Sequence, residues 1–467
     1  MSTKLRLTGR QHELLRRHLF PGDGNEAVAL CLCGLRRGVD TVLSVQSVHP
    51  IPYEMCSVRR VDAVVWSTDS LPTLLEEAAR RGRVLLKVHS HPQGFDEFST
   101  RDDASDRSVF ASAYGWVDGP GPHASAVMLP GGRMFGRAVS PTGGFEPLES
   151  IAVAGDDIRI WRASEPSTVV PEFMLRHQQL FGEGTSQILR RLSIAIVGAS
   201  GSGSPMFELA LRLGVGRIVL VDPQAVEEKN LNRIINATYA DIGRPKVTVL
   251  SAAAQRIGLG TDVVPIAKSI ANTSAVHAVA TCDVLFGCVD SAEARHLLSR
   301  LATFYCLPYI DVGVQIDADG NGGVDQICGA VHYLQPDGSS LLSRRAYSLE
   351  DVRAEEARRV DPERYKGLLD DGYIKGVRVE QPAVIHLNTL VASLAINELL
   401  ARLHPFRLGR NAEFWVTRLS LTGGIISEDQ EPEPPPCEVL SQHVGRGDVS
   451  PRLAMPEIVE DEVQDAS

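Results

Sequence analysis

Hydrophobic residues follow two patterns along the chain, and the change of pattern predicts two folded domains. Up to about residue 145, short apolar runs are broken by glycines, which predicts a strand-rich region. From about residue 190, apolar strands alternate with helical stretches, the order typical of an α/β sheet. The boundary is expected between Ser140 and Glu172. The late run IHLNTLVASLAINELLARL predicts an amphipathic helix packed on the second domain.

The last part of the chain has a different composition. The run EDQEPEPPPC, from Glu428 to Cys437, combines acids with prolines, which resist both helix and sheet, and MPEIVEDEVQDAS is acidic. We therefore expect a first domain over 1–145, a linker over 146–169, a second domain over 170–427 and a mobile tail over 428–467. No fixed-period repeat is present, so solenoid and propeller folds are not expected.

Composition narrows the class of protein. The chain has 467 residues, 43% of them hydrophobic and 22% charged, which suits two or three soluble domains. A net charge of −11 and a pI near 5.7 argue against a nucleic-acid partner. No apolar run approaches the roughly 18 residues of a membrane span. We expect a cytoplasmic protein that does not bind membranes.

The eight cysteines are scattered through the chain, which favours reduced core residues over a disulfide framework. No C-x-x-C pair is present, so a four-cysteine structural zinc site is not expected.

Potential metal ligands follow the apolar run VLLKV. His89 and His91 form an H-x-H pair, and a later S-x-x-D brings Ser99 and Asp102. Alternate residues of a strand project from one face, so the two imidazoles and the aspartate would give three ligands and leave one position for water. Three ligands and an open position are typical of catalytic zinc.

Zinc hydrolysis also needs a base to manage the proton of water. Glu26, in NEAVALCLCG, is the best candidate, and Glu54 is a weaker alternative. Together these residues resemble the signature of JAMM/MPN metallopeptidases over residues 1–145. The resemblance implies a mixed α/β, cytidine-deaminase-like domain that hydrolyses peptide or isopeptide bonds near ubiquitin-like C-termini. It also implies zinc on His89, His91 and Asp102, acid/base catalysis by Glu26 and oxyanion stabilisation by Ser99.

A nucleotide-binding pattern opens the second domain. The strand LSIAIV is followed by a turn containing Gly198, Gly201 and Gly203 and then by a helical run. Such glycines let the backbone approach a phosphate at a helix N-terminus. A second strand ends at Asp222, where a carboxylate can accept hydrogen bonds from a ribose. A dinucleotide-binding domain would explain these features equally well.

The residues further along the chain favour an ATP site over a dinucleotide site. KNLNRI, DIGRPKV and VLFGCVDSAEAR supply in order Asn230, Arg233, Lys246 and Asp290. Adenylation of a carboxylate needs cations for the phosphates and an acid for magnesium. The ordered set resembles the ubiquitin-activating superfamily, with its ThiF-type bacterial adenylyltransferases, over about residues 170–425. The resemblance implies a Rossmann-like doubly wound α/β domain that binds ATP and magnesium. It assigns Gly198, Gly201, Gly203 and Asp222 to the nucleotide, Asn230, Arg233 and Lys246 to the phosphates, and Asp290 to the metal.

Arg176, in LRHQQLFG, fits the family's N-terminal arginine, which reaches the partner subunit's site, so the resemblance implies a homodimer. The chain departs from the family pattern at His177, at Ser200 in the glycine turn and at Gln224 after the aspartate.

A further departure concerns the thioester step, because no cysteine lies between residues 329 and 436. Cys288 and Cys306 are expected in the core, and Cys328 and Cys437 remain candidates for a catalytic thiol. Without a thiol relay, the acyl-adenylate would pass to an amine, a sulfur donor or a separate conjugating protein.

The two halves suggest that a peptidase exposes the C-terminus of a ubiquitin-like or sulfur-carrier protein and that the second half activates it with ATP, as in bacterial ubiquitin-like modification systems. One alternative is an adenylating enzyme of cofactor or peptide natural-product synthesis. Another is that one half is a pseudoenzyme scaffold that binds a ubiquitin-like partner.

Overall fold

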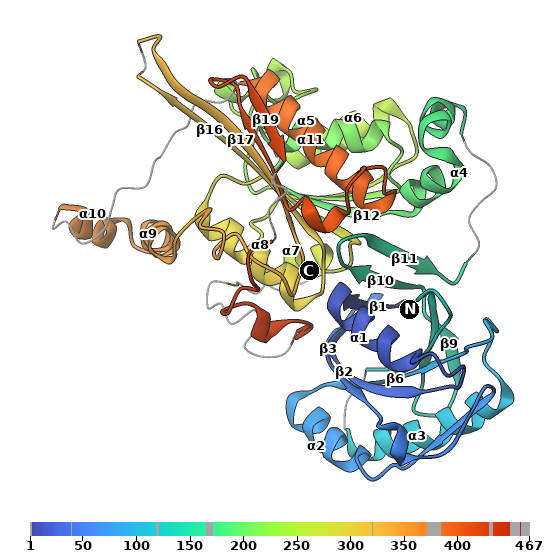
Figure 1. The fold of residues 1–467 in the computed structure, drawn as a ribbon. Helices are drawn as coiled ribbons and strands as arrows, with labels where there is room; N and C mark the ends of the chain where they lie inside the picture. The colour runs from blue at the N-terminus through green and yellow to red at the C-terminus, as the bar shows by residue number, and fades with distance from the viewer. Residues whose placement is uncertain are drawn as a thin grey trace, which may run out of the picture. The chain divides into compact units, whose positions relative to one another are not determined.

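A computed structural model describes residues 2–38, 40–117, 121–164, 171–319, 321–370, 384–428, 433–448 and 458. The chain divides into two compact units. Unit 1 comprises Met1–Glu165 with Thr303–Cys306 and Leu440–Ala454, and unit 2 comprises Pro166–Ala302, Leu307–Val439 and Met455–Ser467 (Figure 1).

Unit 1 is built on a nine-stranded mixed sheet with the order β11-β10-β1-β3-β2-β6-β7-β8-β9. Its elements are β1 (Ser2–Thr8), α1 (Gly9–Leu19), β2 (Val28–Arg36), β3 (Asp40–Pro50), η1 (Tyr53–Met55), β4 (Cys56–Arg60), β5 (Ala63–Trp66), α2 (Leu71–Arg81), β6 (Val84–Ser90), α3 (Thr100–Trp116), β7 (His123–Met128), β8 (Met134–Val139), β9 (Phe145–Pro147), β10 (Ser150–Ala154), β11 (Ile158–Arg162) and η6 (Ser441–His443). A separate hairpin pairs β4 with β5.

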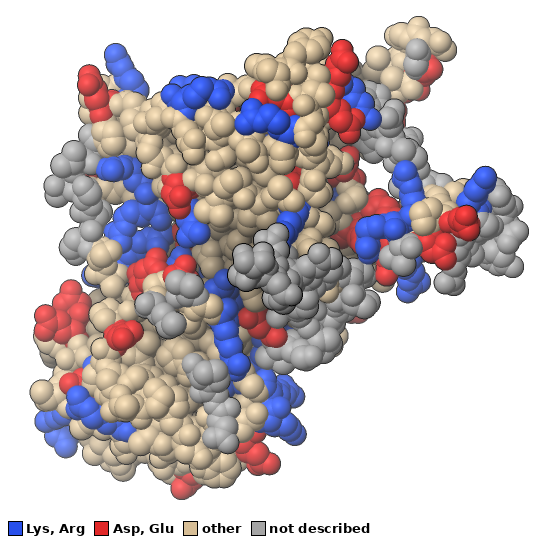
Figure 2. Space-filling model, turned by 180° about the vertical axis from the view of Figure 1, so that it is seen from behind, with Lys and Arg blue, Asp and Glu red and all other residues tan. Residues whose placement is uncertain are grey.

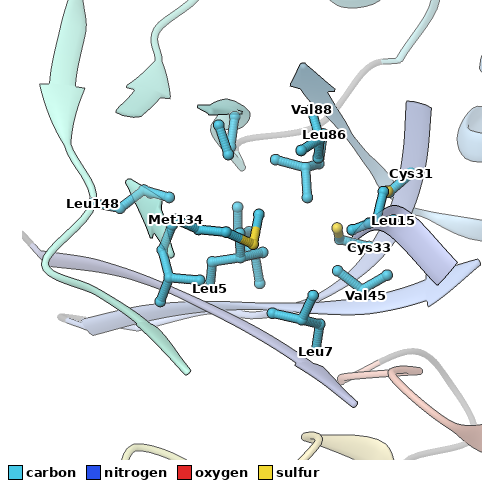
Figure 3. Packing of buried hydrophobic residues seen from close by; sticks show 14 of the residues in the cluster. Leu5, Leu7, Leu15, Cys31, Cys33, Val45, Leu86, Val88, Met134 and Leu148 are labelled. Atoms are coloured by element: carbon cyan, nitrogen blue, oxygen red, sulfur yellow. The ribbon is translucent and has the colours of Figure 1, made fainter. Parts of the chain in front are cut away.

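The central strand β2 is buried along its whole length because both faces of the sheet are covered. Its alternate side chains enter two different hydrophobic clusters. Cys31 and Cys33 pack with Leu15 of α1 and Leu5 of β1 in one cluster (Figure 3). The other cluster holds side chains of α2 and α3, including Phe110. Alternate side chains of β2 therefore contribute to both hydrophobic clusters.

The segment expected as a linker over 146–169 is in part sheet, which corrects the prediction. β10 pairs in parallel with β1, and β11 pairs antiparallel with β10. Ile151 and Val153 of β10 and Ile158 of β11 are buried, and these apolar residues are the signal that a linker would lack. The domain limits themselves stay predictions.

Unit 2 contains an eight-stranded sheet with the order β14-β13-β12-β15-β16-β17-β18-β19. Its elements are η2 (Glu172–Met174), α4 (Leu175–Arg191), β12 (Ser193–Val197), α5 (Gly203–Arg212), β13 (Arg217–Val221), η3 (Glu228–Asn230), η4 (Tyr239–Asp241), α6 (Lys246–Ile257), β14 (Asp262–Ile266), α7 (Thr273–Val279), β15 (Val284–Gly287), α8 (Ala292–Phe304), β16 (Tyr309–Ala318), β17 (Val324–Leu334), α9 (Leu349–Val360), α10 (Pro362–Asp370), α11 (Ile385–Leu403), η5 (Asn411–Glu413), β18 (Val416–Ser420) and β19 (Ile425–Glu428).

The first five strands in this order, β14-β13-β12-β15-β16, are all parallel. The chain adds strands outward from β12 on one side and from β15 on the other, so the strand order switches between β12 and β15. In open α/β sheets, ligands bind at the carboxyl ends of the strands at such a switch point. The predicted helix over IHLNTLVASLAINELLARL is confirmed as α11. No helix in the described ranges is long and apolar enough to cross a bilayer.

Residues 433–448 of the predicted mobile tail are packed, which corrects that expectation. Cys437 and Leu440 are each 3% exposed. In unit 1, Gly34 N donates to Gly445 O at 3.0 Å, and Asp448 N donates to Leu35 O at 3.0 Å. The apolar residues after the prolines anchor the segment.

On the face seen in Figure 2, acidic and basic side chains are interspersed.

Candidate functional sites

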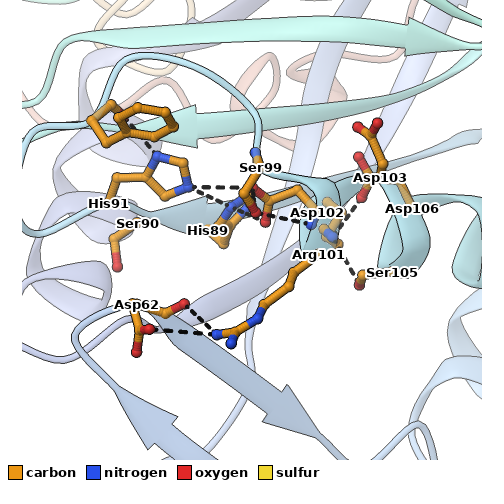
Figure 4. A network of polar contacts seen from close by, with 12 residues as sticks. Asp62, His89, Ser90, His91, Ser99, Arg101, Asp102, Asp103, Ser105 and Asp106 are labelled. Carbon is orange, nitrogen blue, oxygen red and sulfur yellow. Dashed lines mark hydrogen bonds and ion pairs between the residues drawn. The ribbon is translucent and has the colours of Figure 1, made fainter.

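The predicted metal ligands of unit 1 converge. His89 lies near the end of β6, His91 just beyond it, and Asp102 in the first turn of α3. The ligand atoms of the three residues all lie within 4.8 Å of one another. Both imidazoles are directed at the Asp102 carboxylate (Figure 4). A strand end and a helix N-terminus therefore bring together residues that a loop separates in sequence.

The spacing of these atoms suits a zinc ion. Two ligands of a tetrahedral zinc, each at 2.0–2.1 Å, lie roughly 3.3–3.4 Å apart. Here the two Nε2 atoms are 3.1 Å apart, and Asp102 oxygens lie 2.9 Å from His89 Nε2 and 3.6 Å from His91 Nε2. His91 Nδ1 lies 2.7 Å from the Phe95 carbonyl oxygen, to which it donates when Nε2 is the free nitrogen. Burial lowers the pKa of His89, which favours the neutral imidazole that binds a metal.

Ser99 and Asp102 form the capping box of α3. Ser99 N and Oγ each donate to Asp102 Oδ2 at 2.7 Å, and Asp102 N donates to Ser99 Oγ at 3.2 Å. Burial alone would raise the pKa of Asp102, but hydrogen bonds from His89 and His91 hold it well below its usual range. The S-x-x-D spacing therefore fixes the carboxylate as well as the helix start. A role of Ser99 toward an oxyanion stays a prediction.

Glu26 is 7% exposed and lies two residues before the start of β2. Its neighbour Ala27 is tied to the end of β6, because Ala27 N donates to Ser90 Oγ at 3.0 Å. Burial raises the pKa of Glu26 to about 7, with smaller electrostatic contributions from His91 and Asp102. The carboxyl thus shares the electrostatic environment of the metal ligands. The alternative base, Glu54, is exposed on η1.

A buried charge network lies beside the metal ligands, and none of its residues was predicted from the sequence. Asp106 is fully buried; Lys87 Nζ lies 2.5 Å from one of its oxygens, and two guanidinium nitrogens of Arg137 donate to the other at 2.7 and 3.1 Å. Arg137 also pairs with Asp103 at 2.5 Å. Its guanidinium stacks 3.8 Å from the ring centre of Phe98, the residue before Ser99. The signal available in the sequence was Asp106, which follows Asp102 of the motif by four residues.

In unit 2, β12 leads into the glycine turn and α5, as predicted. Gly198 has φ +97°, and a Cβ there would lie 2.3 Å from Cys288 O. A Cβ on Gly203 would lie 1.8 Å from Gly198 O. These two positions accept only glycine, since the turn and the start of α5 press against each other and against the end of β15.

Asp222, at the end of β13, holds the turn in place. Its Oδ2 accepts from Ala199 N at 2.8 Å and its Oδ1 accepts from Gln224 N at 2.8 Å. The residue is 5% exposed. The carboxylate is therefore used to order the backbone around the nucleotide loop.

Four charged residues of the predicted site lie beside this loop: Asp222, Arg233, Lys246 and Asp290. Lys246 is 3% exposed and its Nζ donates to Gln224 Oε1 at 2.6 Å. Burial lowers the pKa of Lys246, while Asp222 and Asp290 raise it and Arg233 lowers it further. Gln224, noted above as a departure from the family, thus orients the buried lysine. Arg233 is half-buried and Asp290 is exposed.

Asn230 and Arg176 stand apart from these charges. Asn230 is 4% exposed, and its Oδ1 accepts from Glu227 N at 3.1 Å, which caps η3. Arg176 is exposed on α4 and donates to Gln179 Oε1 at 3.2 Å. Within the described residues, the contacts of Arg176 do not connect it to Lys246. Its action across a dimer stays a prediction.

The cysteines resemble core residues more than nucleophiles. Burial raises the pKa of Cys288 to about 12, and Cys306 is 2% exposed. Cys437, expected in a mobile tail, is buried because the tail folds there. Cys328 on β17 is half-buried and accepts a hydrogen bond from Gln326 Nε2 at 3.0 Å.

Comparison with family models supports both resemblances. The model of the ThiF family matches residues 174–421, more than half of the chain. The model described as prokaryotic homologs of the JAB domain matches residues 10–135. The predicted JAMM-type and ThiF-type domains are thereby confirmed, as is the predicted fold class of two successive α/β domains.

Curated relatives match only part of the chain. The SAMP-activating enzyme E1 of Haloferax volcanii is 28% identical over 156 residues, which are 33% of this chain and 54% of that protein. The adenylyltransferase and sulfurtransferase UBA4 of Meyerozyma guilliermondii is 29% identical over 131 residues, 28% of this chain and 31% of that protein. The sulfur carrier protein adenylyltransferase of Thermus thermophilus is 27% identical over 138 residues, 29% of this chain and 51% of that protein. The chain thus spans about a third to a half of the length of these relatives.

Among solved structures, E. coli MccB with succinimide has 16% identity, covers 59% of this chain and 75% of MccB, and has a TM-score of 0.45.

Proposed function

The chain belongs to the ThiF family and carries a prokaryotic JAB domain, and we propose that it is a bifunctional enzyme acting on a ubiquitin-like or sulfur-carrier protein. In this proposal, unit 1 is a zinc-dependent (iso)peptidase and unit 2 an ATP-dependent adenylyltransferase. The observation that carries the proposal is the placement of Lys246, Arg233 and Asp290 around Asp222 and the glycine turn. The names of the relatives supply the class of substrate.

In the adenylation step, a carboxylate oxygen of the substrate's C-terminus attacks the α-phosphorus of ATP. The bond from that phosphorus to the bridging oxygen of the β-phosphate breaks, and pyrophosphate leaves with its electron pair. In this proposal, Lys246 and Arg233 offset the negative charge that develops on the phosphates. Asp290 is the residue that would hold magnesium on them.

In the hydrolytic step, His89, His91 and Asp102 would hold zinc, which when bound supplies Lewis-acid activation of water and of the scissile carbonyl. Glu26 takes a proton from the attacking water and delivers it to the leaving amine, so the C–N bond breaks to give a free carboxylate. Burial raises the pKa of Glu26, which suits a carboxyl that has to accept a proton and release it again.

The fate of the acyl-adenylate separates two versions of the function. Cys306 is buried and the pKa of Cys288 is raised to about 12, so transfer to either thiol is disfavoured. The adenylate would then pass directly to an amine, a sulfur donor or a conjugating protein. Because two of the relatives are named for sulfur transfer or sulfur carriers, sulfur-carrier activation is the second candidate function. We propose that the enzyme works as a homodimer in which Arg176 reaches the partner's site.

ATP–pyrophosphate exchange tests the adenylating half, because exchange reports adenylate formation without the acceptor. We expect exchange that depends on the ubiquitin-like substrate and that Lys246→Ala abolishes, while Lys268→Ala, an exposed lysine of the same unit, leaves it intact. Exchange that survives Lys246→Ala would contradict the assignment.

Release of a C-terminal extension from the same substrate tests the peptidase half. We expect release that His89→Ala abolishes together with zinc content. Zinc without cleavage would instead support a scaffold role for unit 1.

A further inference from the structure

The side chain of Asn388 lies against the glycine turn of unit 2. Asn388 is in the first turns of α11, and it is 4% exposed. A Cβ built on Gly201 would lie 2.7 Å from Asn388 Nδ2. That nitrogen has no hydrogen-bond partner in the described part of the chain. An amide donor is therefore buried, unpartnered and directed at the nucleotide loop.

An unpartnered buried donor is costly, and proteins keep few of them. The neighbours of Asn388 on the buried side of α11 are apolar, among them Val391, Ala392 and Ala395. A leucine at this position would continue that apolar surface without a desolvated amide. Packing alone therefore does not explain the asparagine, whereas a hydrogen-bond acceptor that arrives with a ligand does.

The groups around the turn indicate which acceptor is missing. Backbone N–H groups at the start of α5, together with the cations Lys246 and Arg233, are donors. Asp222 is already engaged by Ala199 and Gln224. A site with this surplus of donors takes an anion, and the anion of the proposed reaction at a glycine turn is a phosphate.

We infer that Asn388 Nδ2 donates a hydrogen bond to a phosphate oxygen of the nucleotide bound at the glycine turn. The inference rests on the proposed adenylating function and adds a residue of α11 to its site. It also explains why position 201 is glycine, although φ there is ordinary. A side chain at Gly201 would fill the space between the turn and the amide.

The test uses the full-length protein with Asn388→Leu and with Asn397→Leu, an exposed asparagine of the same helix, as the matched control. Affinities for ATP and adenosine are measured by competition against a fluorescent ATP analogue. Asn388→Leu should weaken ATP binding roughly 10- to 100-fold, the loss expected for a hydrogen bond to a charged group. Adenosine affinity should be unchanged, and Asn397→Leu should match the wild type for both ligands.

Thermal stability separates this role from a structural one. A packing or loop-supporting asparagine would lower the unfolding temperature of unit 2 when replaced. Removal of an unpartnered donor should instead leave that temperature unchanged or raise it. Asn388→Ala, which removes the amide without adding volume, gives a second reading if leucine is not accommodated.

Unchanged ATP affinity in both variants would overturn the inference while leaving the proposed function intact. An equal loss for ATP and adenosine, or a loss that accompanies lower stability, would also overturn it. A wild-type protein that binds no ATP would contradict the proposed function itself.

Discussion

The buried charge network beside the metal ligands predicts a large effect of Asp106→Asn. Lys87 and Arg137 supply two positive charges, and Asp103 and Asp106 supply two negative ones, so the network is neutral. Asp106→Asn keeps the shape but leaves one positive charge uncompensated beside a fully buried side chain. Breaking a buried pair in this way costs about 3–5 kcal/mol. For a unit of this size, that corresponds to a fall in unfolding temperature of roughly 6 to 20 °C.

Tryptophan fluorescence measures this effect selectively. Of the four tryptophans, Trp66, Trp116 and Trp161 belong to unit 1 and Trp415 to unit 2. The exposed Asp69→Asn is the matched control and should change the stability of unit 1 by about 0.5 kcal/mol or less.

A double variant tests the charge argument further. Lys87→Met alone leaves a net negative charge, but Lys87→Met with Asp106→Asn restores neutrality. The pair should therefore be less destabilised than the sum of the single variants by about 1–3 kcal/mol. Additive effects, or an Asp106→Asn protein as stable as Asp69→Asn, would show that Asp106 does not balance the charges of Lys87 and Arg137.

Three further predictions concern the two sites and the C-terminal segment. Glu26→Gln should keep zinc by metal analysis but slow cleavage by about 10²- to 10⁴-fold; retained cleavage would reassign the base. Gly203→Ala should abolish ATP binding, because its Cβ would lie 1.8 Å from Gly198 O, while Gly184→Ala, which meets nothing within 4 Å, should bind normally; equal binding by both would refute the close approach. Gly445→Ala should lower the unfolding temperature of unit 1 and leave pyrophosphate exchange unchanged, since residue 445 has φ +65° and a Cβ there would lie 2.1 Å from Val45 O; an unaltered unfolding temperature would contradict the packing of that segment.

The parts of the sites that follow from local sequence were predictable. An H-x-H pair on a strand and an S-x-x-D helix start each fix their side chains within a few residues, and the glycine turn fixes its own backbone. The long apolar period of α11 was equally readable, because a helix of this length leaves little ambiguity.

Contacts between distant segments were not predictable from one sequence. Arg137 of β8 contacts Asp106 of α3, and Asn388 contacts Gly201, from which most of the sequence of unit 2 separates it. Neither residue lies in a motif with fixed spacing. The strands β10 and β11 were missed because β10 pairs with β1, the first strand of the chain, and β11 pairs with β10. The packed residues after Glu433 were missed because the preceding prolines and acids dominated the composition.

We propose that the two units act in succession on one carboxylate. The most direct test of this proposal is pyrophosphate exchange with a ubiquitin-like substrate supplied either with a C-terminal extension or already processed. We expect wild-type protein to support exchange with both forms and Glu26→Gln to support exchange only with the processed form. Exchange by Glu26→Gln with the extended form would show that activation does not depend on cleavage and that the two units do not act in succession.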